Sequence, residues 1–248
     1  MPLLSAATIH DIVHVMSSLY RAAMREHPPV VIANPFADLD LPRIEPRSVE
    51  FYEHDEAAAL YEAAGDWCTL VELGMDVGLR CGEIYGLHGH RVDWLRGKIE
   101  VVDVMTRQGL RQWPKSKRSH RVVPVPPHVL KDMSMLMTGR PRDALVFTAP
   151  HGGPVTDEHF RNRVWYPAIE AAGVRRFPPR IMRHTAASWL VQDGVPLYDV
   201  QALLGHEDYA TTQRYAHLAP DAHGKVIESW ARRAGAPAAH GPKEGRLP

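Results

Sequence analysis

One block of the sequence, residues 91–125, alternates apolar and polar residues, while helical periodicity dominates the chain around it from Val49 onward. The alternation in 91–94, 98–104 and 121–125 predicts three short antiparallel strands. Helices are expected at 56–64, 67–77, 127–137, 157–172, 181–193, 197–204, 208–216 and 219–233. The fold class is therefore α+β, mainly α-helical with a small antiparallel β-sheet.

The chain divides into three parts. Apolar residues recur at a helical period from residue 5 to 26, and the stretch that follows, with Asn34-Pro35 and prolines between Leu41 and Arg47, has the composition of a linker. Residues 47–234 form the large domain that a chain of 248 residues with 45% hydrophobic content can build. The tail 235–248, rich in glycine, proline and charge, is predicted to be flexible.

Charge is segregated along the chain, although the formal net charge is zero. No acidic residue lies between Met105 and Leu130, whereas acidic residues are frequent from Asp38 to Asp66. Such segregation predicts a basic face that binds the phosphates of a nucleic acid, although charge runs can also be ordinary solvated surface. The basic residues in this stretch are Arg107, Arg111, Lys115, Lys117, Arg118 and Arg121, and a second cluster contains Arg161, Arg163, Arg175, Arg176, Arg180 and Arg183.

Several classes of protein are disfavoured. The two cysteines, Cys68 and Cys81, lie in apolar helical surroundings, which is typical of a reduced, cytoplasmic protein. We find no signal peptide and no apolar run near the ~20 residues of a membrane span. The closest histidine groupings, His88 with His90 and His206 with His217, lack the spacing of zinc sites, so we expect no metal. No cofactor is expected either.

Four residues suit attack on a phosphodiester by a phenol: Arg80, Arg183, His206 and Tyr215. Arginine binds two phosphate oxygens at once and stays charged. A phenol ionises near pH 10, so at neutral pH it needs a base to take its proton and fixed cations to absorb the charge that develops on the phosphate.

These residues stand in motifs that resemble those of the tyrosine recombinases, the phage integrase family. Gly78–Ile84 is similar to the first arginine box, with Arg80 as its arginine and Glu83 as the acidic companion. Lys115–Pro124 resembles the lysine hairpin, and Arg183-His184-Thr185 the second arginine box. Leu203–His206 and Thr211–Tyr215 match the histidine and nucleophile segment, including the interval of nine. Four motifs in the family's order are a specific signal.

The resemblance implies a tyrosine recombinase catalytic-domain fold over 47–234, preceded in 1–46 by the last helix of a truncated core-binding domain and its linker. It implies a site-specific recombinase or integrase, in which Tyr215 attacks DNA to form a 3'-phosphotyrosyl link and Lys115 protonates the departing 5'-oxygen. The implied partners are double-stranded DNA attachment sites and three further copies of the chain on DNA, with a monomer expected free in solution. The phosphate would be held by Arg80, Arg183, His206 and Arg180.

One position departs from the family's pattern: Arg180 stands three residues before Arg183, where the family usually has histidine. Arginine does not release its proton near neutral pH, so the acceptor of the tyrosine proton is left open among His184, His206 and solvent. His184 could instead only cap or pack its helix.

The general acid, the nucleophile and the function each have a rival interpretation. Lys117 lies two residues from Lys115 on the same loop, and Tyr209 and Tyr198 are rival nucleophiles. A noncatalytic DNA-binding relic and topoisomerase-like nicking and resealing are the competing functions.

Overall fold

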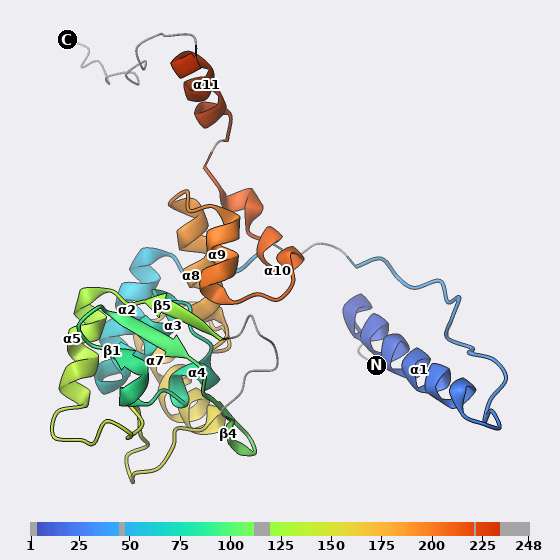
Figure 1. Cartoon of the computed structure of the whole chain (residues 1–248), viewed down its shortest axis with the longest axis horizontal. Coiled ribbons are helices and arrows are strands. Elements are labelled where there is room, and N and C mark those ends of the chain that lie inside the picture. The colour runs from blue at the N-terminus through green and yellow to red at the C-terminus, as the bar shows by residue number, and fades with distance from the viewer. Residues whose placement is uncertain (1–3, 45–47, 112–119, 221, 234–248) are drawn as a thin grey trace. The chain divides into compact units, whose positions relative to one another are not determined.

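The computed structural model describes residues 4–44, 48–111, 120–220 and 222–233. The chain forms two units, Met1–Ser48 and Val49–Pro248, and each is described by itself (Figure 1). The predicted tail 235–248 and three of the predicted basic residues, Lys115, Lys117 and Arg118, lie outside the described residues.

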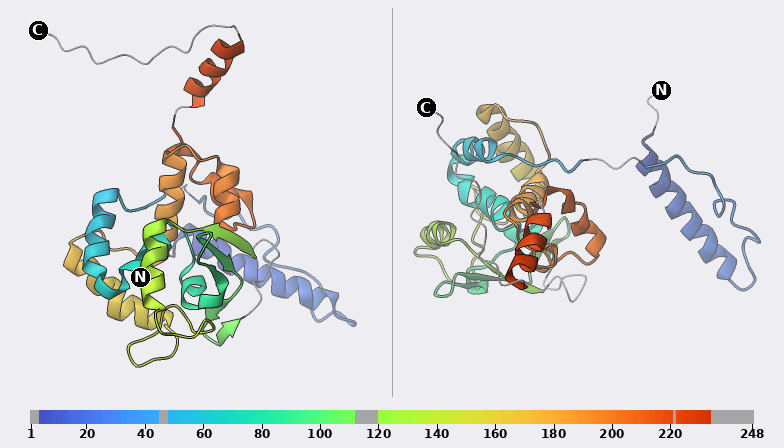
Figure 2. Two further views of the ribbon diagram at one scale, coloured as in Figure 1. Left: turned by 60° about the vertical axis from the view of Figure 1, so that its left-hand side comes forward. Right: turned by 90° about the horizontal axis from the view of Figure 1, so that it is seen from above.

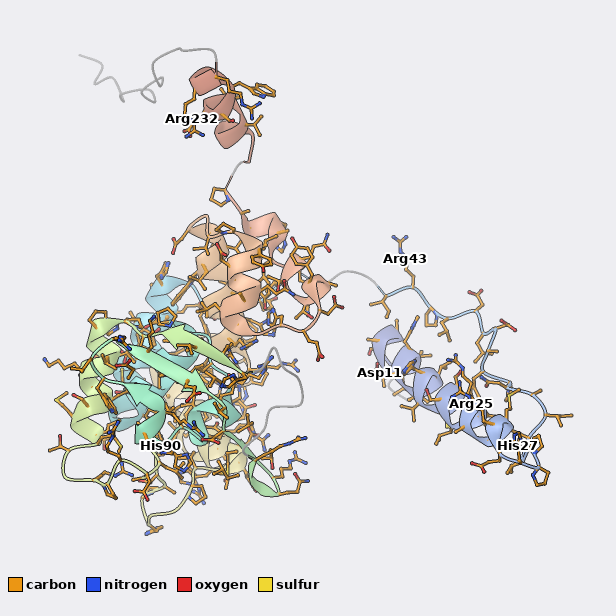
Figure 3. All side chains as sticks on the ribbon, in the orientation of Figure 1. Asp11, Arg25, His27, Arg43, His90 and Arg232 are labelled. Carbon is orange, nitrogen blue, oxygen red and sulfur yellow. The ribbon has the colours of Figure 1, made fainter. Side chains whose placement is uncertain are left out.

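The first unit is one helix followed by a strap, residues 26–44, that folds back along it. Helix α1, Ala6–Arg25, confirms the helix predicted for 5–26. In the strap, Asn34 Nδ2 donates to Ser17 Oγ at 2.9 Å, and the ring of Phe36 lies 5.4 Å from that of Tyr20. Figure 3 shows the charged side chains that line this helix, Asp11 and Arg25 among them. The segment predicted to be a linker therefore packs on the helix that precedes it.

The predicted three-stranded sheet is present in the second unit. Its strands are β1 (Val92–Asp93), β2 (Lys98–Val101) and β5 (Arg121–Pro124), antiparallel in the order β1-β2-β5. Ile99 pairs with both Val92 and Val123, and all three side chains are buried. Alternation along the strands thus sends one face of the sheet into the core.

The second predicted strand, 98–104, is wrong in its length. It stops at Val101, and the chain then forms a separate hairpin from β3 (Val104–Thr106) and β4 (Gly109–Arg111). Gly109 has a φ of 109°, which favours glycine, and Thr106 Oγ1 donates to its carbonyl at 2.8 Å. The tight turn made by these residues ends β3 after three residues.

Helices build the rest of the second unit, as predicted. They are α2 (His54–Ala64), α3 (Cys68–Met75), α4 (Cys81–Tyr85), α5 (Pro127–Leu136), α6 (Asp157–His159), α7 (Tyr166–Ala172), α8 (Ile181–Gln192), α9 (Leu197–Leu204), α10 (Tyr209–Gln213) and α11 (Ala222–Arg233). A π-helical segment, Phe160–Trp165, joins α6 to α7, so the predicted helix 157–172 is continuous. Short 3-10 turns stand at Gly65–Trp67, Gly89–Arg91 and Ala216–Leu218.

Two helix predictions need correction. No helix was predicted between residues 77 and 127, where the structure has α4, Cys81–Tyr85. The predicted helix 208–216 ends at Gln213, and Tyr215 lies between α10 and the following 3-10 turn. α10 is shorter because Arg214 and Tyr215 leave the α-helical pattern for 3-10 hydrogen bonds, in which Leu218 N donates to Tyr215 O at 2.9 Å.

Buried side chains form two clusters. The larger contains Tyr52, Leu60, Leu73, Ile99 and Trp165, from the sheet and the helices around it. The smaller lies among α8, α9 and the segment after α10, and contains Ala187, Val191, Val200, Leu204 and Tyr215. Helix α9 packs against both α8 and α10 and also reaches β5, and Figure 2 shows these elements from two further sides. This second cluster is the floor of the site described next.

Two absences hold for the described part of the chain. None of its helices is both long and apolar enough to cross a membrane. The same residues contain no group of three or more His, Cys, Asp or Glu side chains placed to hold a metal ion.

Candidate functional site

The C-terminal end of α9 gathers three arginines that are far apart in the sequence. The carbonyls of residues 203–205 accept, in that order, from Arg121 Nε at 2.7 Å, Arg183 Nη2 at 2.5 Å and Arg80 Nη2 at 3.2 Å. The last carbonyls of a helix lack partners within it and form the negative end of its dipole, so they favour cations. Gly205, with a φ of 66°, ends the helix in the left-handed region.

Gly78 provides a second backbone acceptor for Arg183. Its carbonyl accepts from Arg183 Nη1 at 2.9 Å. Its φ is 76°, and a Cβ at this position would lie 2.4 Å from Leu204 Cδ2. A side chain there would strain the backbone and displace Leu204, which accounts for the glycine two residues before Arg80.

Glu83 joins two of these arginines. Its side chain is buried, with Oε1 2.8 Å from Arg80 Nη1, and it receives two parallel hydrogen bonds from Arg121, at 3.0 and 2.9 Å. Burial by itself would raise the pKa of Glu83, but the hydrogen bonds and charge of Arg121, with Arg80 and Arg183, lower it to about 2. Glu83 is therefore ionised at neutral pH, and it is the acidic companion of Arg80 that the motif predicted.

Arg121 was predicted to contact DNA, and the structure corrects that prediction. Its side chain is only 7% exposed, because β5 alternates and turns Arg121 and Val123 inward while Val122 faces out. Arg121 instead ties strand β5 to Glu83 and to the end of α9. The sequence carried a signal for this inward direction, because Arg121 alternates in phase with the apolar residues Val123 and Val125.

Arg107 and Arg111 are exposed on the β3–β4 hairpin, as a phosphate-binding role requires. The hairpin is seated on α4, where close contact demands two glycines. A Cβ on Gly82 would lie 2.7 Å from the Met105 carbonyl oxygen, and one on Gly86 would lie 2.9 Å from Met105 N. The helix that begins after Arg80 therefore also positions these two cations.

The side chains of Tyr215 and His184 lie within hydrogen-bonding distance of each other, in the same pocket as the arginines. Tyr215 is 2% exposed, and its Oη lies 2.5 Å from His184 Nδ1. Burial raises the pKa of Tyr215, against the opposing effect of Arg214 and Arg183. Burial, with the charges of Arg214, Arg180 and Arg183, lowers the pKa of His184 to about 4, so both groups are neutral at pH 7.

His206 is also buried, and its Nδ1 lies 2.8 Å from Thr212 Oγ1. Burial, followed by the charges of Arg183 and Arg80, lowers the pKa of His206 to about 3. Its ring is therefore neutral at pH 7, with one N–H to donate. Thr212 was missed in the sequence, where its position three residues before Tyr215 carried no signal of its own.

One pocket of about 560 Å³ lies at the centre of this site. It brings together six of the predicted site residues, namely Arg80, Arg180, Arg183, His184, His206 and Tyr215. Burial, with the charges of Arg80 and Arg121 against that of Glu83, lowers the pKa of Arg183 to about 9, so it remains charged at neutral pH. The rival tyrosines, Tyr198 and Tyr209, are exposed and do not line this pocket.

The pocket suits an anion flanked by a nucleophile. Four guanidinium groups line it, beside a neutral histidine and a tyrosine that is hydrogen-bonded to a second neutral histidine. Fixed cations of this kind stabilise charge that develops on a phosphate during attack. The ion pair between Arg161 and Asp157, at 3.5 Å, forms part of the wall.

Comparison with known proteins gives a consistent result. Residues 50–222 match the model of the phage integrase family. The chain is 29% identical over 242 residues to tyrosine recombinase XerC of Bacillus pumilus, covering 93% of this chain and 77% of that protein. It is 28% identical over 211 residues to tyrosine recombinase XerD of Pseudomonas aeruginosa, covering 82% and 68%.

A solved structure shares the fold. The Tn1549 transposon integrase, in complex with a circular intermediate DNA, matches with a TM-score of 0.74 and 17% identity, over 93% of this chain and 80% of that chain.

Proposed function

This chain belongs to the phage integrase family and is a site-specific tyrosine recombinase, and from that premise we propose how its residues cleave and rejoin DNA. The observation that carries the proposal is that Tyr215 shares a pocket with Arg80, Arg183 and His206. The intact set of ionisable groups in this pocket gives no support to a noncatalytic relic.

Arg80 and Arg183 hold the nonbridging oxygens of the scissile phosphate. Carbonyls 78, 204 and 205 and Glu83 occupy some of their N–H groups, and a guanidinium carries five, so donors remain for the phosphate. His206 donates from Nε2 in this scheme, which requires the tautomer whose Nδ1 accepts from Thr212 Oγ1. Arg180, exposed at the mouth of the pocket, adds a third cation.

Tyr215 Oη attacks phosphorus in line and displaces the 5'-oxygen, which leaves the protein joined to the 3' side of the break. Lys115 protonates the departing oxygen. The energy of the phosphodiester is kept in the phosphotyrosyl bond, so a 5'-hydroxyl from a partner duplex rejoins the strand without a nucleotide cofactor. Four protomers act on two attachment sites, and the free chain is a monomer.

A nicked suicide substrate that carries the attachment sequence tests this function. Attack by Tyr215 releases a short 5' fragment, so rejoining fails and the covalent protein–DNA product accumulates. The product should run as a slow band on a denaturing gel. A protein that forms none on a verified site does not use this mechanism.

Binding to DNA should weaken steeply with salt. Each arginine that neutralises a phosphate contributes about 0.9 to the slope of log K against log salt concentration. The Arg107→Gln/Arg111→Gln variant should therefore have a slope shallower by about 2, measured by fluorescence anisotropy. Arg96→Gln, an exposed arginine outside the basic clusters, is the control and should keep the original slope. An unchanged slope in the double variant would remove the hairpin from the DNA-binding surface.

Arg180 should act as a phosphate ligand and not as a base. Losing a hydrogen bond from a charged donor costs roughly 1.5 kcal/mol or more, so Arg180→Ala should cleave about tenfold more slowly. Arg180→His should restore or exceed the original rate, because imidazole can exchange a proton near neutral pH. Single-turnover cleavage measures both. An inactive histidine variant beside an active alanine variant would contradict the position given to Arg180.

A further inference from the structure

We propose that His184 is the base of this reaction, accepting the proton of Tyr215 Oη during cleavage and returning it during rejoining. This role rests on the proposed function of the pocket. Its basis is geometric: His184 Nδ1 lies 2.5 Å from Tyr215 Oη, within the distance that proton transfer requires. Both side chains also line the pocket that holds the arginines, so the transfer takes place beside the phosphate.

The other candidates are placed for different tasks. Arg180, at the position where the family's histidine is expected, does not release its proton near neutral pH and is exposed. His206 directs its Nδ1 at Thr212 Oγ1, 2.8 Å away. Among the hydrogen bonds of the described residues, the one that Tyr215 Oη makes is with His184 Nδ1.

The charges around His184 keep its ring neutral, so that a ring nitrogen is free to accept a proton. It faces Arg180, which precedes its helix, Arg183 on that helix, and Arg214 and Tyr215 on the segment after α10. Burial and the three arginines disfavour the imidazolium, so the ring is neutral before DNA binds. A neutral ring whose Nδ1 accepts from the phenol must carry its proton on Nε2.

The same cations couple the proton transfer to the presence of DNA. A bound phosphate brings negative charge among Arg80, Arg180 and Arg183, which offsets their repulsion of an imidazolium. His184 therefore becomes a stronger base when the scissile phosphate is in place, and Tyr215 stays protonated when the pocket holds no phosphate.

Bonds and protons balance in both directions of the reaction. The bond from Tyr215 Oη to phosphorus forms while the bond from phosphorus to the 5'-oxygen breaks, and the phenolic proton moves to His184 Nδ1. The 5'-oxygen takes its proton from the general acid, for which Lys115 is proposed. In rejoining, a 5'-hydroxyl attacks phosphorus and gives its proton back to Lys115, the bond from phosphorus to Tyr215 Oη breaks, and the proton on His184 returns to that oxygen.

The test is single-turnover cleavage of a suicide substrate by His184→Gln, which retains polar atoms near Tyr215 but accepts no proton. General base catalysis contributes about 10²- to 10⁴-fold, so cleavage should slow by at least about 100-fold while DNA affinity is kept. His217→Gln, which alters an exposed histidine two residues beyond Tyr215, is the matched control and should cleave at the original rate.

A second background separates a base from a merely structural residue. Replacing Tyr215 by 3,5-difluorotyrosine lowers the phenol pKa towards neutrality, so that ionisation no longer requires a base. In this background His184→Gln should cost less than about tenfold, whereas a packing defect would cost the same in both backgrounds. Added imidazole should also partly restore His184→Ala.

Three results would overturn the role of His184. They are an unchanged rate in His184→Gln, an equal loss in the two tyrosine backgrounds, or no adduct from the unaltered protein on a verified site. The first two leave the recombinase mechanism in place, and the third removes it together with the role of His184.

Discussion

Tyr215→Phe is expected to abolish covalent attachment to DNA while leaving the fold and the affinity for DNA intact. The substitution removes only the hydroxyl that points at His184, and the ring keeps its place in the cluster with Val200 and Leu204. Binding depends on the arginines, which are unaltered. The measurement compares adduct formation on a nicked suicide substrate with anisotropy on the same duplex.

The rival tyrosines supply the controls. Tyr209→Phe and Tyr198→Phe alter exposed side chains outside the pocket and should form the adduct at the original rate. If Tyr215→Phe still became covalently attached, the nucleophile would lie elsewhere, and the pocket around His184 and Arg183 would need another role.

Arg121→Met should lower the free energy of unfolding by about 3 kcal/mol or more, because removing one partner of a buried ion pair leaves the other charge poorly compensated. Glu83 would keep only the partly exposed Arg80, and the Leu203 carbonyl would lose its donor. Urea titration followed by circular dichroism measures the loss. Adduct formation should fall as well, since Arg121 holds the end of α9 on which Arg80 and Arg183 rest.

Two further measurements make this prediction specific to the ion pair. The double variant Glu83→Leu/Arg121→Met should be less destabilised than the sum of the single variants, since no buried charge is left without a partner. The loss caused by Arg121→Met should also shrink with acid. The pKa of Glu83 is lowered from 4.5 to about 2 in the fold, so its stabilisation is complete above pH 4.5 and disappears as the pH falls towards 2. A loss that is independent of pH would assign the effect to packing instead.

Local patterns in the sequence were sufficient for most elements and for the identity of the pocket residues. The helical periods around α8 and α9 and the alternation of β1, β2 and β5 are properties of short segments. They predicted these elements to within a few residues. Motif spacing then brought Arg80, Arg183, His206 and Tyr215 into one site.

What the sequence did not indicate depends on contacts between distant segments. Helix α4 is five residues long, too short for a periodicity signal, and is fixed by the contact of Gly82 with the β3–β4 hairpin. The ion pair that Arg121 forms with Glu83 joins residues 38 positions apart in the chain. No local pattern encodes the convergence of three arginines on the last carbonyls of α9.

The same applies to the proton acceptor. From the sequence, the acceptor of the Tyr215 proton was open among His184, His206 and solvent, because the spacing of the motifs does not distinguish between them. In the fold, His184 follows Arg183 on α8 and reaches Tyr215, 31 residues later, at hydrogen-bonding distance. The reaction therefore has a base in His184, although arginine stands at position 180 where the family usually has histidine.

Mass spectrometry of the trapped protein–DNA adduct tests the central claim most directly. After digestion of the DNA with nuclease and of the protein with trypsin, the peptide 215–225 should carry a nucleotide joined through its 3'-phosphate to Tyr215. A nucleotide on Tyr209 or any other residue, or a 5'-phosphate linkage, would contradict the mechanism built on this pocket.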